Sequence, residues 1–169
     1  TVRLLQSEFD ISKQKANLLT ETSLIQATVK PEEDDISLYI HVPFCTTRCS
    51  YCSFPSELVS RVEPLMDAYL DAVEKEVRFI TSTANGRFES LYVGGGTPTS
   101  LSEKHFERLC GICNEAVTKR GIKEFTLEAG RPDTVNREKL LMMKDAGVTR
   151  ISINPQTMNN KTLEIIGRK

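Results

Sequence analysis

The chain has 169 residues, of which 39% are hydrophobic and 27% are charged, a composition typical of a folded globular domain. Its formal net charge is −1 and no basic run stands out, so nothing indicates a nucleic-acid partner or an anionic membrane surface. No apolar stretch approaches the roughly 20 residues of a membrane-spanning helix, and we expect no membrane span.

The first 35 residues are predicted to form a helical segment followed by a linker. The scattered apolar anchors of the helical part are Leu18, Leu19, Leu24 and Ile25. Lys30-Pro-Glu-Glu-Asp-Asp35 then combines a proline with an acidic run, which favours a solvated turn. We therefore expect residues 1–35 to be the remnant of an upstream region and residues 36–169 to form a separate domain.

From residue 36 onward, a short apolar strand, a loop and an amphipathic helix follow one another repeatedly. The strands are expected at residues 37–42, 90–93, 124–127 and 150–153. Such alternation implies parallel strands joined by crossover helices. The pattern fits either an open doubly wound sheet or part of a (β/α) barrel.

Each strand is followed by a helix with its own boundary signal. The first helix is expected to begin at Pro64, a favoured first-turn residue, and Ser102 is the expected N-cap of the second. The third should cover about residues 137–146, with Gly147 just past its end. The fourth begins near Asn160, and we expect the chain to end inside it.

A full eightfold barrel needs roughly 250 residues. This chain does not begin with Met and is predicted to end within a helix, so we expect a piece of a longer protein. The predicted fold class is α/β: a partial (β/α) barrel, truncated after about four β/α units, with an N-terminal helical segment.

Cysteine usage points to a reducing compartment, and we expect a cytoplasmic protein. The chain has five cysteines, an odd number that argues against a closed disulfide framework. The first residues also lack the apolar centre of a signal peptide. Cys110 and Cys113 lie on the apolar face of the second helix, where packing explains them better than a redox or metal pair.

The other three cysteines, Cys45, Cys49 and Cys52, share one loop after the first strand. Their spacing, C-x3-C-x2-C, suits three corners of a [4Fe–4S] cluster. Three thiolates leave the fourth iron without a protein ligand, where the amino and carboxylate groups of S-adenosylmethionine (SAM) can bind. The open alternative is a zinc site completed by His41, although zinc sites favour C-x2-C pairs.

A glycine run, Gly94-Gly-Gly-Thr-Pro-Thr99, directly follows the second strand. Glycines let the backbone approach a ligand closely, although a tight turn also explains such a run. Ligands of parallel sheets and barrels bind at the carboxyl ends of the strands. The cysteine loop, the glycine run, Glu128 and Gln156 each follow a different strand, so we expect them to meet on one face of the fold.

Together these motifs resemble radical SAM proteins of the oxygen-independent coproporphyrinogen III dehydrogenase (oxidase) group. The residues that carry the resemblance, between about positions 37 and 168, are Tyr39-x-His41-x-Pro43-Phe44-Cys45, the cysteine triad, Gly94-Gly-Gly-Thr-Pro98 and Arg150-Ile-Ser-Ile-Asn-Pro-Gln156. A dehydrogenase-like subgroup of bacterial haem-synthesis proteins is matched best, through Glu128-Ala-Gly-Arg-Pro-Asp133 and Asn154-Pro-Gln-Thr157.

The resemblance implies roles for ten residues. The [4Fe–4S] cluster would be bound by Cys45, Cys49 and Cys52. Near the cluster, SAM would lie beside Tyr39. Its methionine end would be cradled by Gly95, Gly96 and Thr97. Its methionine and ribose groups would be bound by Glu128, Gln156 and Arg168, since carboxylates accept from ammonium and hydroxyl groups and arginine pairs with carboxylates.

The residue types alone also allow purely structural roles for these side chains. Tyr39 could be a core aromatic, and Glu128 an exposed acid at a strand end. Gln156 could cap the next turn, and Arg168 could be solvated.

Three functions are compatible with the sequence. In the expected one, a deoxyadenosyl radical takes a hydrogen atom from a propionate of coproporphyrinogen III, and loss of CO2 and an electron leaves a vinyl group. This enzyme would need a tetrapyrrole substrate and an electron-donor protein. The second is a haem-binding chaperone: two residues after the third cysteine this chain has Phe54, where the resemblance implies another cysteine in the dehydrogenases proper. The third is a zinc-stabilised module without redox chemistry.

Overall fold

The computed structural model describes residues 1–168 and divides the chain into two compact units between Glu33 and Asp34. The first unit contains two helices, α1 (Val2–Phe9) and α2 (Lys13–Gln26), as expected for the N-terminal segment. Within these helices only Ala16 is buried, because two short helices cannot enclose a core. The expectation of apolar anchors is therefore wrong, and the side chains in question are exposed: Leu18, Leu19, Leu24 and Ile25.

The second unit is built around a four-stranded parallel sheet. Its strands, in their order across the sheet, are β1 (Asp35–Val42), β4 (Arg87–Gly95), β5 (Glu124–Glu128) and β6 (Arg150–Ser152). All four predicted strands are confirmed. β4 is longer than expected and takes in Gly94 and Gly95, so the glycine run begins inside the strand.

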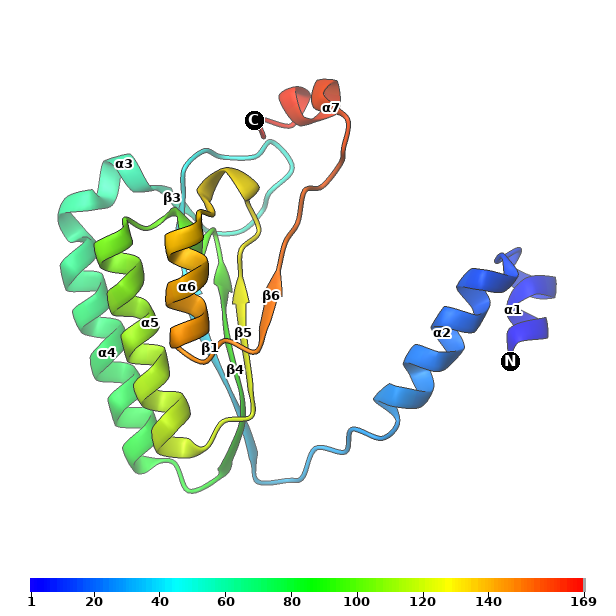
Figure 1. Ribbon diagram of the computed structural model, residues 1–169, viewed down its shortest axis with the longest axis horizontal. Coiled ribbons are helices and arrows are strands. Elements are labelled where there is room, and N and C mark those ends of the chain that lie inside the picture. Colours follow the sequence, from blue (N-terminus) through cyan, green and yellow to red (C-terminus); the bar gives the residue numbers. More distant parts are fainter. Residues whose placement is uncertain (169) are drawn as a thin grey trace. The chain divides into compact units, whose positions relative to one another are not determined.

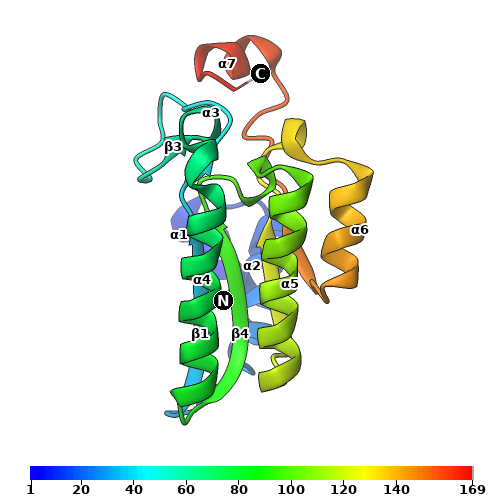
Figure 2. The ribbon, with the colours of Figure 1, turned by 90° about the vertical axis from the view of Figure 1, so that its left-hand side faces the viewer.

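Three crossover helices connect these strands: α4 (Met66–Thr83), α5 (Glu103–Arg120) and α6 (Arg137–Asp145). They pack side by side on one face of the sheet (Figures 1 and 2). A doubly wound sheet carries helices on both of its faces, whereas a barrel carries them only outside. The arrangement is therefore that of part of a barrel wall.

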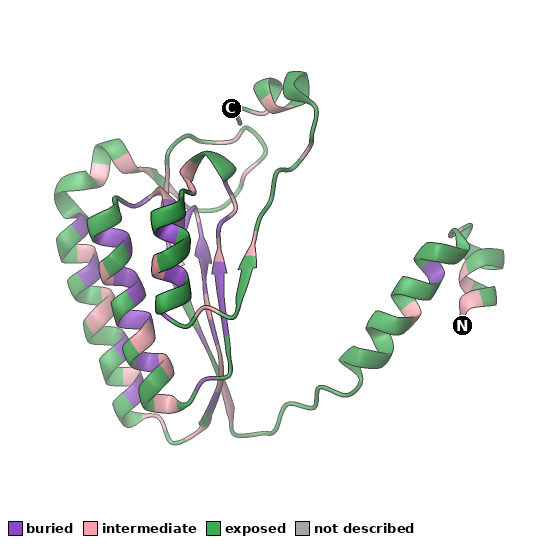
Figure 3. Cartoon of the chain, viewed as in Figure 1, coloured by how far each residue is buried: buried purple, intermediate pink, exposed green. Residues whose placement is uncertain are grey.

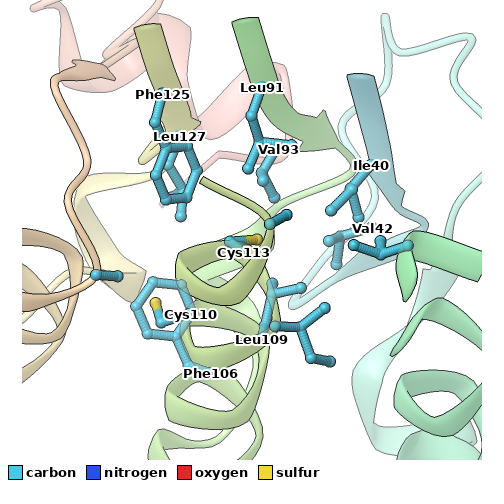
Figure 4. Close-up of a cluster of buried hydrophobic side chains, with 14 of the residues drawn as sticks. Ile40, Val42, Leu91, Val93, Phe106, Leu109, Cys110, Cys113, Phe125 and Leu127 are labelled. Atoms are coloured by element: carbon cyan, nitrogen blue, oxygen red, sulfur yellow. The ribbon is translucent and has the colours of Figure 1, made fainter. Parts of the chain in front are cut away.

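The core lies between the sheet and these helices. Alternate strand residues, among them Ile40, Val42, Leu91, Val93, Phe125 and Leu127, point toward Phe106 and Leu109 of α5 (Figure 4). Figure 3 shows the buried residues concentrated in the strands and on the helix sides that face them. Cys110 and Cys113 belong to this core, so their structural role is confirmed.

The helix boundary signals are confirmed at two sites. Ser102 caps α5 by accepting a hydrogen bond from the His105 amide. Gly147 follows α6 with a φ of +84°, a conformation that favours glycine.

Two helix boundaries were predicted wrongly. Pro64 does not begin the first long helix but lies in a 3-10 turn, Glu63–Leu65, between the short α3 (Val59–Val62) and α4. Its fixed φ suits this tight turn as well as it suits an α-helix. The last helix, α7 (Asn160–Ile165), ends before Gly167, whose φ of +71° turns the backbone out of the helix.

Candidate functional site

One cavity lies at the carboxyl ends of the strands. It is lined by nine of the ten residues to which the sequence assigns a cofactor role, namely Cys45, Cys49, Cys52, Gly95, Gly96, Thr97, Glu128, Gln156 and Arg168. These residues are the last residues of β4 and β5 or lie in the segments that follow β1, β4, β5 and β6, and these strand ends meet at the same end of the sheet (Figure 1). The structure therefore brings together residues up to 123 positions apart in the sequence.

The cysteine loop leaves the sheet through a short parallel ladder, in which β2 (Phe44–Cys45) pairs with β3 (Glu57–Leu58). All three cysteines are free and half-buried, and the Cys45 Sγ atom lies 3.4 Å from the Thr97 Oγ1 atom. A backbone hydrogen bond of 3.2 Å from the Cys52 amide to the Cys49 carbonyl closes the turn between those two cysteines. The loop thus presents its thiols to the cavity.

The zinc alternative requires a fourth ligand, and His41 is not among the residues that line this cavity. Its ring lies beside Gly95, and its buried Nε2 atom has no hydrogen-bond partner among the described residues. Within residues 1–168, no three His, Cys, Asp or Glu side chains are grouped as ligands of a single metal ion.

The glycine run packs directly against the cysteine loop. The Gly96 amide donates to the Val42 carbonyl at 2.8 Å, and the Thr97 amide donates to the Phe44 carbonyl at 2.7 Å. A Cβ atom on Gly96 would lie 2.6 Å from the Phe44 oxygen and 3.0 Å from the Cys45 Sγ atom. Close approach of two backbones, rather than a turn alone, therefore explains the glycine at position 96.

Glu128 ends β5 and receives a 2.7 Å hydrogen bond from the Tyr92 hydroxyl. This hydrogen bond raises the pKa of Tyr92. The ring of Tyr39 stacks on Tyr92 with centroids 5.8 Å apart. Tyr39 itself is 51% exposed and does not line the cavity, so it is neither a core aromatic nor a direct part of the cavity wall.

Arg168 is buried, which excludes the interpretation of a solvated side chain. Its guanidinium donates to the Tyr51 hydroxyl and to the Gly130 carbonyl. Both acceptors are neutral, so neither of these two hydrogen bonds brings a negative charge to the guanidinium. The chain around it also packs on the cysteine loop, since the Ser50 amide donates to the Ile166 carbonyl at 3.1 Å.

Other residues also line the cavity, and among them Tyr51 and Arg131 are ones to which the sequence analysis gave no role. Tyr51 stands between the second and third cysteines, and its place in the loop could have indicated it. Arg131 follows the end of β5 by three residues, so the rule that sites form after strand ends could have found it.

These residues fit an iron–sulfur cluster with SAM beside it. Three free thiols in one cavity are the donor set that a cluster with one open iron needs. The buried Arg168 supplies a cation for a carboxylate, and Gly96 keeps the wall free of a side chain.

Residues 39–169 match the family model of the Radical SAM superfamily. The chain belongs to this superfamily. Among its relatives, the oxygen-independent coproporphyrinogen-III oxidase-like protein HemZ of Bacillus subtilis is 34% identical over 97% of this chain and 34% of that protein. The haem chaperone HemW of the same species is 40% identical over 78% of this chain and 35% of that protein.

A solved radical SAM structure has the same fold. Coproporphyrinogen III oxidase (HemN) from Escherichia coli superimposes with a TM-score of 0.67 and 27% sequence identity, covering 88% of this chain and 34% of that one. The four-stranded sheet and its helices are therefore part of a radical SAM barrel, as the sequence predicted. The chain spans about a third of the length of the relatives that it matches.

No helix of residues 1–168 is long and apolar enough to cross a membrane.

Proposed function

We propose that this chain is the cluster- and SAM-binding part of a radical SAM enzyme that converts propionate side chains of coproporphyrinogen III to vinyl groups without oxygen, in haem synthesis. Residues 36–169 would form the N-terminal part of the radical SAM core, and residues 1–35 the remnant of an upstream region. The observation that carries the proposal is the convergence of three thiols, the glycine run and a buried arginine on one cavity. The substrate is inferred from the names of the relatives.

In this proposal the three cysteines hold three irons of the cluster and leave one iron for SAM. When bound, the cluster supplies the electron that splits SAM and so provides a radical able to take hydrogen from a propionate. Arg168 would bind the SAM carboxylate, because its guanidinium lies in the cavity wall and its two hydrogen bonds go to neutral acceptors. The Gly95–Thr97 segment makes room for the methionine end.

Glu128 and Gln156 would bind the SAM ammonium or ribose groups. Glu128 already accepts one hydrogen bond from Tyr92, which fixes one of its oxygens and leaves the other for a ligand. Tyr39 would then act by holding Tyr92, on which it stacks, rather than by touching SAM from the cavity wall. An electron-donor protein would reduce the cluster.

A haem chaperone is the second candidate, and two observations favour it. Phe54 lines the cavity at a position where the resemblance implies cysteine in the dehydrogenases proper. HemW, a relative named as a haem chaperone, is 40% identical to this chain. In that case the same cavity would hold a cluster, while haem would be bound and delivered.

The test is anaerobic incubation of the reconstituted protein with dithionite, SAM and coproporphyrinogen III. We expect 5′-deoxyadenosine and a product in which a propionate has become a vinyl group, both detected by mass spectrometry. Cys52→Ala is the matched variant and should yield neither. Stable haem binding without 5′-deoxyadenosine would contradict the enzyme and favour the chaperone.

A further inference from the structure

Arg131 is a buried arginine for which the proposed function has no use. Only 4% of its surface is exposed, and it lies in the segment between β5 and α6. A buried guanidinium is costly unless its donors are matched by acceptors, so its contacts indicate what it does.

The two edges of this guanidinium face different partners. Its Nε and Nη2 atoms pair with both carboxylate oxygens of Asp133, at 3.1 Å and 3.2 Å. Its Nη1 atom points the other way and donates to the Thr47 Oγ1 atom at 2.7 Å and to the Thr47 carbonyl at 3.3 Å. Asp133 therefore holds the arginine so that its free edge meets the middle of the cysteine loop.

The same Nη1 atom lies 4.0 Å from the Cys49 Sγ atom, the outer limit of a hydrogen bond to sulfur. A cation at this distance in a buried site interacts much more strongly with a thiolate than it would in water. Reduction adds one negative charge to a cluster, so a nearby positive charge stabilises the reduced form more than the oxidised form.

We propose that Arg131 is a positioning residue that fixes the cysteine loop through Thr47 and raises the reduction potential of the cluster through its charge beside Cys49. The inference deepens the proposed function and rests on it only in that Cys49 binds the cluster. A purely structural role, a staple between Arg131 and Asp133, is the competing explanation.

The two explanations differ in what happens when Asp133 is changed. Arg131→Gln removes the positive charge and should lower the midpoint potential. Asp133→Asn removes the compensating negative charge and should raise it. A structural staple is broken by either variant, and so predicts no opposite shifts.

The experiment is a redox titration of the reconstituted full chain, followed by electron paramagnetic resonance, for the wild type and both variants. We expect about a tenfold lower equilibrium constant for reduction in Arg131→Gln, which corresponds to about 59 mV for one electron. The expected shift in Asp133→Asn has the opposite sign. The matched control is Arg78→Gln, an exposed arginine paired with Glu74 and Glu115, which should leave the potential unchanged.

A potential that is unchanged or lower in Asp133→Asn overturns the proposal, and that variant decides the question even if Arg131→Gln assembles no cluster. A wild-type protein that takes up no cluster would instead refute the proposed function. The two failures are therefore distinguishable.

Discussion

At the scale of single residues, the cysteine loop can pack against the glycine run only because position 96 carries no side chain. At Gly96 the Phe44 carbonyl and the Cys45 sulfur lie close to the position that a Cβ atom would take. The φ of Gly96 is not in the left-handed region, so the constraint is steric and not conformational. Any side chain there has to push the backbone that carries Cys45.

We predict that Gly96→Ala displaces this backbone, because a Cβ atom would lie 2.6 Å from a carbonyl oxygen that has no freedom to rotate away. The expected result is a large loss of iron content after reconstitution and a fall of about 1–3 kcal/mol in the free energy of unfolding, measured in urea.

The matched control for this change is Gly111→Ala, within α5. Nothing lies within 4 Å of the added Cβ atom, and alanine favours a helix interior, so stability should rise by about 0.5–1 kcal/mol with iron content unchanged. Equal iron content in the two variants would contradict the packing argument for Gly96.

Site residues that belong to a local sequence pattern could be predicted, whereas those defined by contacts between distant segments could not. Cysteine spacing and a glycine run are local patterns, and both are visible in the sequence. The position of Arg131 after β5 is visible in the sequence, but its contacts are not, because its partners Thr47 and Cys49 are more than 80 positions away. Tyr39 is expected beside the cofactor; in the structure its ring stacks on Tyr92 and does not line the cavity, and its place relative to SAM stays a prediction.

At the scale of elements, the two cysteines of α5 differ from the three in the loop after β1: those of α5 are buried, and those of the loop are half-buried. The α5 residues Cys110 and Cys113 are buried in the apolar core (Figure 4). Burial raises the pKa of the Cys110 thiol to about 12 and that of Cys113 further. The thiolate is the reactive form, so both should be inert while the fold is intact.

We predict that iodoacetamide at pH 8 modifies Cys45, Cys49 and Cys52 in the cluster-free native protein, and modifies Cys110 and Cys113 only in urea. Peptide mass spectrometry locates the modified residues, and the urea sample serves as the positive control. Native modification of Cys110 at the rate of Cys49 would contradict the packing of α5.

At the scale of the whole molecule, strand–helix alternation predicted the parallel sheet, because that connection requires a crossover. The alternation did not decide between a barrel and a doubly wound sheet, since both share it. The position of α4, α5 and α6 on one face decides it. Polar and aromatic residues of the other face, such as Tyr39 and Tyr92, then lie where a barrel has its interior.

The same architecture explains why the site could be anticipated in outline. Parallel strands place their carboxyl ends together, so loops far apart in sequence share one cavity. The burial of Arg168 could not be anticipated, since it depends on α7 bringing the chain back over the cysteine loop through the contact of Ile166 with Ser50.

The proposed function depends on one requirement, that the three cysteines assemble a cubane cluster with one open iron. Its most direct test is the iron and sulfide content of the protein after anaerobic reconstitution, compared with Cys45→Ala and with Cys113→Ala as the control outside the cavity. We predict about four irons and four sulfides per chain in the wild type and in the control, with a sharp loss in Cys45→Ala. Stoichiometric zinc with no uptake of sulfide would contradict the account.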